Sequence, residues 1–175
     1  MNELEQIREQ LVAERRHAAA VARACASIPG GVPVQEFRNA CTDYLVRVLA
    51  SFEERDQRLG DLAHQPLASE DAPRRALVEV LGRPGTSREV LEKLAAACDA
   101  NSTQSWQEFL QYFTQVWCAR RAAIDALLAS HPRVADWRAV SGIDADSILE
   151  ERTRYARVSE HLPAGVTLTA QGANS

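Results

Sequence analysis

The sequence predicts an all-α protein, an up-down antiparallel four-helix bundle with an additional C-terminal helix. Two observations predict this fold class. Apolar residues recur at spacings of three, four and seven along most of the chain, which is the period of an amphipathic helix. Groups of proline and glycine divide this pattern into segments of helix length. Long amphipathic helices joined by short connections favour antiparallel neighbours, so a bundle follows.

The first two segments are the longest. The first has its apolar stripe at Leu4, Ile7, Leu11, Ala18, Val21 and Cys25. It stops at Ile28-Pro29-Gly30-Gly31, because proline and glycine break helices. The second begins after Pro33, fades at Gly60 and ends before Pro66. Its apolar stripe comprises Phe37, Cys41, Tyr44, Leu45, Val48, Phe52, Leu59 and Leu62.

The third region predicts two short helices. Asp71 is placed to cap the first, which carries Ala76, Leu77, Val80 and Leu81. The run from Gly82 to Gly85 interrupts it. Thr86 and Glu89 have the spacing of a capping box and predict the start of the next helix, which ends at Asn101 and Ser102.

The fourth region predicts one long helix that stops before Pro132. Ser105 and Glu108 have the spacing of a second capping box at its start. Together with earlier residues it supplies the expected core, which includes Leu11, Val48, Phe52, Phe113, Trp117, Ile124 and Leu128.

The C-terminal region predicts a short turn around Val134 and Trp137 and then a last helix. Asp144 or Asp146 caps that helix, and Pro163 and Gly165 end it. Its apolar residues are Ile148, Leu149, Tyr155, Val158 and Leu162. Residues 166–169 have strand character but no partner strand.

Composition narrows the function classes. The chain has 175 residues, 46 % hydrophobic and 25 % charged, which fits one globular domain. Its formal net charge of −4 lacks the basic excess typical of nucleic-acid binding. No stretch approaches the roughly 20 apolar residues of a membrane span, and the N-terminal residues lack an apolar signal core. We expect a cytoplasmic protein with one domain over residues 1–163 and a flexible tail over residues 164–175.

Three charged residues stand where the helical pattern calls for apolar ones: Glu14, Arg55 and Arg120. An unpaired buried charge is costly, so each needs a partner or an escape to water. One interpretation is an internal polar patch, and the other is long side chains that reach solvent from a slightly rotated helix. With the first hairpin reversing near residue 31, Glu14 is expected beside Val48 and Arg55 beside Ile7. Glu14 and Arg55 are then about 10 Å apart along the bundle axis.

The sequence gives only weak indications of a metal site or of a reactive thiol. Glu14 and His17 have a carboxylate-x-x-His spacing, as do Asp61 and His64, but the two histidines are about 28 Å apart along the predicted bundle. His131 and His161 fall near helix ends. The four cysteines, which are Cys25, Cys41, Cys98 and Cys118, form no CxxC pair. Cys25 and Cys41 can meet across the first hairpin, as a thiol pair or as two core residues, and the sequence does not settle whether they are redox-active.

Two segments resemble the hemerythrin-like family of four-helix bundles. Residues 44–47 and 51–56 are similar to its second helix, and residues 109–128 with 135–137 are similar to its last core helix and the turn beyond. The resemblance implies a non-haem di-iron centre held by histidine and carboxylate. Ser51 and Arg55 stand at two positions where the resemblance implies a His ligand and a Glu ligand.

The resemblance implies a second pair of metal-ligand positions, and these correspond to Val116 and Arg120. These side chains cannot replace imidazole and carboxylate at iron, so no ligand set is carried over. We therefore expect a non-catalytic helical-bundle binding or interaction protein without a cofactor, in the form of a metal-free hemerythrin-like sensor or scaffold.

Its expected partner is another protein or a small molecule rather than nucleic acid or a membrane, and a homodimer is compatible with the sequence. The alternative is a hemerythrin-like or ferritin-like di-iron protein, with non-haem iron as cofactor, that binds oxygen or acts as an oxidoreductase.

Overall fold

The structure is a computed structural model that describes residues 3–28, 34–64, 72–129 and 134–169. Over these ranges all regular elements are helices, which confirms the all-α fold class. None of the described helices is long and apolar enough to cross a membrane. Pro29, Gly30, Gly31, Pro33, Pro66, Asp71 and Pro132, which were expected to bound or cap helices, lie outside the described residues.

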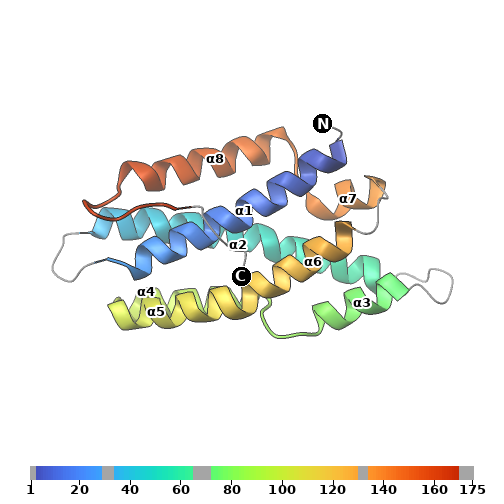
Figure 1. Ribbon diagram of the computed structural model, residues 1–175, viewed down its shortest axis with the longest axis horizontal. Coiled ribbons are helices and arrows are strands. Elements are labelled where there is room, and N and C mark those ends of the chain that lie inside the picture. The colour runs from blue at the N-terminus through green and yellow to red at the C-terminus, as the bar shows by residue number, and fades with distance from the viewer. Residues whose placement is uncertain (1–2, 29–33, 65–71, 130–133, 170–175) are drawn as a thin grey trace.

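Helices α1 (Glu3–Ala26) and α2 (Gln35–His64) run in opposite directions along the length of the molecule (Figure 1). Cys25 lies beside Cys41, and Glu14 contacts Arg55. These contacts give a register in which Glu14 faces a position further along α2 than the expected Val48. The difference arises because the connection between the helices sets the register, and the sequence pattern alone does not fix its path.

Helices α3 (Ala72–Leu81) and α4 (Ser87–Ala100) follow as two separate pieces. The capping box predicted from Thr86 and Glu89 is confirmed, with each side chain bonded to the other residue's backbone. Helix α4 ends at Asn101, which has a left-handed backbone with φ 45°. A left-handed residue is a common helix terminator, and asparagine tolerates it well.

Helix α5 (Thr103–Tyr112), the π-helical segment η1 (Phe113–Cys118) and helix α6 (Ala119–Ala129) form one long rod. The capping box predicted at Ser105 and Glu108 is wrong. The Ser102 hydroxyl accepts a bond of 3.0 Å from the Ser105 amide, so the helix begins one turn earlier. The π segment was not predicted, because its buried residues Phe113 and Trp117 are four residues apart, a spacing that an α-helix also places on one face.

The turn predicted around Val134 and Trp137 is instead helix α7 (Val134–Ser141). Trp137 is buried with Ile7 and Leu11, and this anchor explains why a short helix forms there. Helix α8 (Ala145–Glu160) is capped by Asp144, one of the two predicted caps. Leu149, expected on its apolar face, is 65 % exposed.

The chain beyond α8 forms no strand within the described residues. Leu162 lies just past the helix end, packed against the core. In the segment expected to be a tail, Val166 is buried and Leu168 packs on the core. Residues 170–175 of that segment lie outside the described residues.

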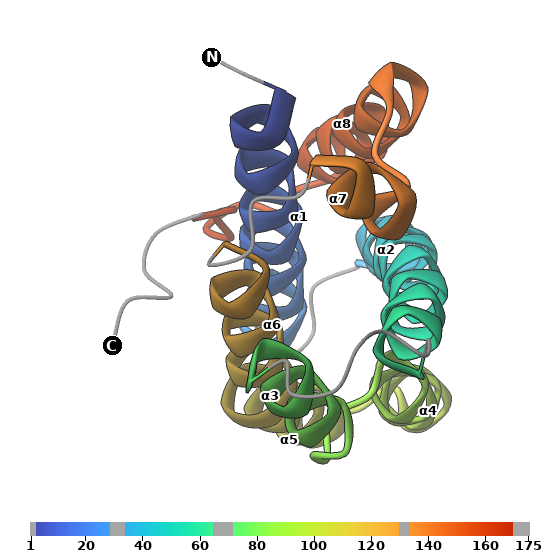
Figure 2. The same ribbon diagram turned by 90° about the vertical axis from the view of Figure 1, so that its right-hand side faces the viewer.

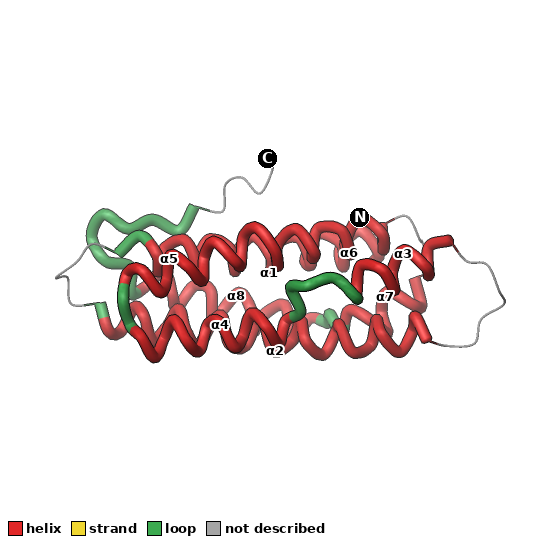
Figure 3. Tube along the Cα trace, turned by 90° about the horizontal axis from the view of Figure 1, so that it is seen from below, coloured by secondary structure: helices red, strands yellow, loops and turns green. Residues whose placement is uncertain are grey.

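The helices form three layers. Viewed from the end, α1 and α2 lie in the middle, α4 and the α5–α6 rod on one side, and α7 with α8 on the other (Figure 2). The long helices lie lengthwise, and α3 and α7 sit at the same end of the molecule (Figure 3). Of the expected core residues, Leu11, Val48, Phe52, Phe113, Trp117 and Ile124 are buried, whereas Leu128 is only partly buried.

Candidate functional site

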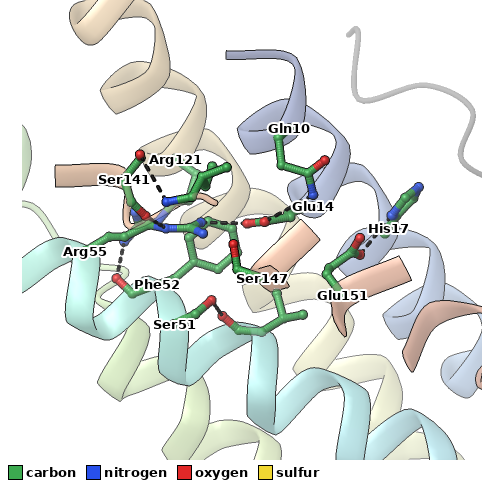
Figure 4. Close-up of polar contacts among 12 residues, drawn as sticks. Gln10, Glu14, His17, Ser51, Phe52, Arg55, Arg121, Ser141, Ser147 and Glu151 are labelled. Carbon is green, nitrogen blue, oxygen red and sulfur yellow. Dashed lines mark hydrogen bonds and ion pairs between the residues drawn. The ribbon is translucent and has the colours of Figure 1, made fainter. Parts of the chain in front are cut away.

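Glu14 of α1 and Arg55 of α2 form a buried ion pair in the interior. Their residues are 3 % and 5 % exposed. Arg55 Nη1 donates to Glu14 Oε2 at 2.6 Å, and Arg55 Nε donates to the Ser141 carbonyl at 2.6 Å (Figure 4). Gln10 Nε2 donates to the other Glu14 oxygen at 3.2 Å. Each charge therefore has a charged partner and a further hydrogen bond, which a buried pair needs to offset its desolvation.

Arg120 does not join this pair, although the sequence placed the three charges in one patch. Its Nη1 donates to Asp56 Oδ2 at 3.2 Å, and its Nη2 donates to the Leu81 carbonyl at 3.3 Å. Arg121, also buried, bonds to the other oxygen of Asp56 and to Ser87. Burial lowers the pKa of Arg121, and the Asp56 carboxylate opposes that change.

A third contact closes a ring of charges across three helices. Arg15 Nη1 of α1 lies 3.2 Å from Asp125 Oδ2 of α6. Burial raises the pKa of Asp125, and Arg15 and Arg121 act against it. The ion pairs thus connect α1 to α2, α2 to α6, and α6 to α1. We call this set the arginine layer, which comprises Glu14, Arg15, Arg55, Asp56, Arg120, Arg121 and Asp125.

A separate polar cluster joins α1, α2 and α8. Glu151 Oε1 accepts a bond of 2.6 Å from the Tyr44 hydroxyl and lies 2.9 Å from His17 Nδ1. Burial alone would raise the pKa of Glu151, but the bonds from His17 and Tyr44 outweigh it, and the pKa is lowered. The His17 ring stacks on Tyr155 with 4.0 Å between ring centres. Glu14 and His17, three residues apart, therefore bond to different partners and do not act as one motif.

A cleft of about 300 Å³ lies between α2 and the first turns of α8. Glu14 and Glu151 line it from within, Arg47, Ser51 and Arg55 from α2, and Ser147 from α8. In Figure 4 the Arg55 guanidinium points to Glu14, while the Glu151 carboxylate points to His17. The cleft therefore has charged groups of both signs around it. We call it the α2–α8 cleft.

The positions that the hemerythrin-like resemblance assigns to iron ligands hold other chemistry. Ser51 lines the α2–α8 cleft and donates to the Val48 carbonyl at 2.8 Å. Arg55 and Arg120 belong to the arginine layer, and Val116 lies in η1. No group of three or more His, Cys, Asp or Glu residues able to hold a metal occurs among the described residues. The His64 side chain and His131 lie outside them, and His161 is 3.8 Å from Glu36.

The cysteines are free thiols, and three of them are buried. Cys41 lies beside Cys25. Burial, and after it the neighbouring Cys25 thiol, raises the pKa of the Cys41 thiol. Burial also raises the pKa of Cys118 to about 12. Because the thiolate is the reactive form, neither sulfur is activated as a nucleophile.

Sequence reasoning did not single out Arg15, Asp56, Arg121, Asp125 or Glu151. The first four look like ordinary polar residues on amphipathic helices. The need for a partner at Arg120 was a signal for an unidentified carboxylate. Glu151 had no comparable signal, because its partners His17 and Tyr44 are more than 100 residues away.

Comparison with protein-family models, with curated proteins and with solved structures gives no match for this chain. The resemblance to hemerythrin-like proteins therefore stands as a hypothesis that rests on the residues alone.

Proposed function

We propose that this chain is a non-catalytic binding or interaction protein, a metal-free hemerythrin-like sensor or scaffold. The observation that supports it is the arginine layer. Arg55 and Arg120 stand where the resemblance expects carboxylate ligands, and both are buried and paired with carboxylates. Guanidinium groups have no lone pair for a metal, so this arrangement fills the interior with charge pairs instead of iron.

The architecture belongs to the same proposal. We describe it as an up-down four-helix bundle made of α1, α2, α3 with α4, and the α5–α6 rod, with α8 as the additional C-terminal helix. Helices α7 and α8 then cover the α1–α2 face. In this description the arginine layer is internal to the bundle, and the α2–α8 cleft lies between the bundle and its added helix.

Binding fits the geometry better than catalysis does. In the arginine layer, each carboxylate faces an arginine. Such pairs fix helices relative to one another, and each carboxylate is engaged by an arginine. The α2–α8 cleft leaves room for a ligand, so binding is assigned there.

The di-iron protein is the second candidate. It is favoured by one observation, the burial of Glu14 and Glu151 close to His17, because these side-chain types bind iron. Against it, Glu14 is occupied by Arg55, and Oε1 of Glu151 is occupied by Tyr44 and His17.

Metal content decides between the two candidates. The chain is expressed in medium with added iron, purified without chelator, and its iron is measured by mass spectrometry together with the visible absorption spectrum. We expect no stoichiometric iron and no charge-transfer band. About two irons per chain would overturn the proposal and establish the di-iron alternative. The variant Glu14→Ala serves as a control, because it removes a carboxylate ligand and would lower the iron content only if iron binds there.

A further inference from the structure

Most charges around the α2–α8 cleft are already paired with each other. Three arginines that line it each contact a carboxylate of the same cleft, and the pairs are Arg55 with Glu14, Arg58 with Glu54, and Arg154 with Glu150. Two lining charges stand outside these pairs. Glu151 pairs with His17, which does not line the cleft, and Arg47 acts on Glu150 through its charge alone. The cleft thus has one cation and one anion that are not matched to each other.

Arg47 is the available cation. It is exposed, and its charge helps to lower the pKa of Glu150, but no hydrogen bond or close ion pair joins it to any residue that the structure describes. Helices α2 and α8 run antiparallel, with Tyr44 beside Glu151 and Arg55 beside Ser141. Arg47 follows Tyr44 by one helical turn, so it lies near the level of Glu151. A guanidinium at this place is suited to a carboxylate, which it can bind through two parallel hydrogen bonds.

Oε2 of Glu151 is the available acceptor. Its residue is only 7 % exposed, and Oε1 takes both bonds from Tyr44 and His17. Oε2 is buried and has no hydrogen-bond partner among the described residues. A buried carboxylate oxygen without a donor is costly, so the site lacks a donor that a bound molecule can supply. Glu151 lines the cleft, so a molecule bound there lies beside this carboxylate.

From this arrangement we propose that the α2–α8 cleft binds a small zwitterion of the α-amino-acid type. The ligand carboxylate bonds to Arg47, and the ligand ammonium donates to Glu151. This inference rests on the proposed binding function and names the chemistry of the ligand.

A plain anion fits the cleft less well. Four carboxylates line it beside four arginines, and two of those carboxylates, Glu14 and Glu151, are buried. An anion would gain Arg47 but would approach the buried Glu151 without compensating charge. A plain amine has the opposite problem at Arg47. Only a molecule with both charges satisfies both ends.

The test uses the full-length protein and titration calorimetry, after a thermal-shift screen of the twenty protein amino acids at millimolar concentration. Acetate and methylamine are screened beside them as carboxylate-only and amine-only probes. We expect at least one amino acid to raise the melting temperature, and neither acetate nor methylamine to do so. For that amino acid, Arg47→Gln should raise the dissociation constant about tenfold or more.

Two further variants keep the test sharp. Arg157→Gln removes an exposed arginine of α8 that does not line the cleft, and binding should be unchanged. Glu151→Gln should also weaken binding. That substitution disturbs α8 packing as well. If the Glu151 variant unfolds, the result for Arg47→Gln decides the test.

The inference is overturned if no amino acid shifts the melting temperature, if acetate binds as well as the amino acids do, or if Arg47→Gln binds like the wild type. Such a result with iron-free protein overturns the ligand class and leaves the proposed metal-free function standing. Stoichiometric iron instead overturns the function.

Discussion

At the scale of single residues, Glu14 and Arg55 show how an off-pattern charge is accommodated. Both lie on apolar stripes, and the structure pairs them at 2.6 Å in the interior. A pair in this position has already lost its water, so its two partners depend on each other. Removing one leaves an isolated buried charge, whereas removing both removes the difficulty.

We therefore expect Glu14→Ala to lower the free energy of unfolding by about 3–5 kcal/mol, with Arg55→Ala in the same range. The double variant should lose less than the sum of the two, because the stranded charge disappears. Urea unfolding of the three variants measures this. Glu79→Ala removes the exposed partner of Arg83 and should cost no more than about 1 kcal/mol. Small additive effects at Glu14 and Arg55 would contradict the buried pair.

Two glycines differ in backbone conformation and in the space around them, so they test whether each position needs glycine. Gly60 lies inside α2, and a Cβ there would meet no atom within 4 Å. Gly85 has φ +105°, and a Cβ there would lie 2.9 Å from Val116 Cγ1. Gly60→Ala should raise the free energy of unfolding by about 0.5–1 kcal/mol, because alanine favours helix.

Gly85→Ala should lower the free energy of unfolding by about 1–3 kcal/mol through backbone strain and the contact with Val116. Thermal unfolding of both variants against the wild type checks the two signs. Equal effects at the two glycines would mean that the turn before α4 does not require glycine.

At the scale of elements, α8 is held to α1 and α2 by polar contacts at Glu151. The lowered pKa of Glu151 has a consequence for stability, because the folded state binds its proton less tightly than the unfolded state does. The contribution is complete above the unfolded pKa of about 4.3 and is lost as the pH falls through the folded pKa. Docking of α8 should therefore weaken in acid.

The expected result is that Glu151→Gln is less stable than the wild type at pH 7 and that this difference shrinks as the pH is lowered from 5 to 3. Urea unfolding at several pH values, followed by circular dichroism, measures it. Glu160→Gln, at the exposed end of α8, is the control and should show no such convergence. A difference that stays constant across this range would show that the Glu151 charge does not contribute.

How far the sequence predicts these elements depends on the range of the interactions that form them. The start of α4 was predictable, because its capping box is a contact between Thr86 and Glu89, three residues apart. Helix α7 was not, since it is anchored by Trp137 packing on Ile7 and Leu11 at the other end of the chain. The π segment escaped for another reason. Its apolar residues Phe113 and Trp117 still face the core, so the stripe shows no break.

The same distinction applies to the candidate site. The off-pattern charges Glu14, Arg55 and Arg120 were visible in the sequence, because periodicity says which face of a helix is buried. Their partners were not all visible. A carboxylate such as Asp56 becomes buried only when three helices meet around it, and pattern alone does not give the register of that meeting.

At the scale of the whole molecule, the arginine layer ties three helices together with charges where apolar side chains would also fit. Buried ion pairs are often no more stabilising than well-packed hydrophobic residues of similar volume, and their use can lie in fixing how elements align. We propose that the Glu14–Arg55 pair selects the α1–α2 register, since a shift of either helix would strand both charges.

This leads to a prediction about the double variant Glu14→Leu with Arg55→Met. Its free energy of unfolding should equal or exceed that of the wild type by up to about 4 kcal/mol, because no charge is left unpaired. The far-UV circular dichroism spectrum should stay fully α-helical. If the pair also selects the register, the variant should lose dispersion in its amide NMR spectrum, because alternative alignments of α1 and α2 become similar in energy. A single sharp set of resonances, with unchanged stability, would instead show that apolar packing and the loops alone determine the alignment.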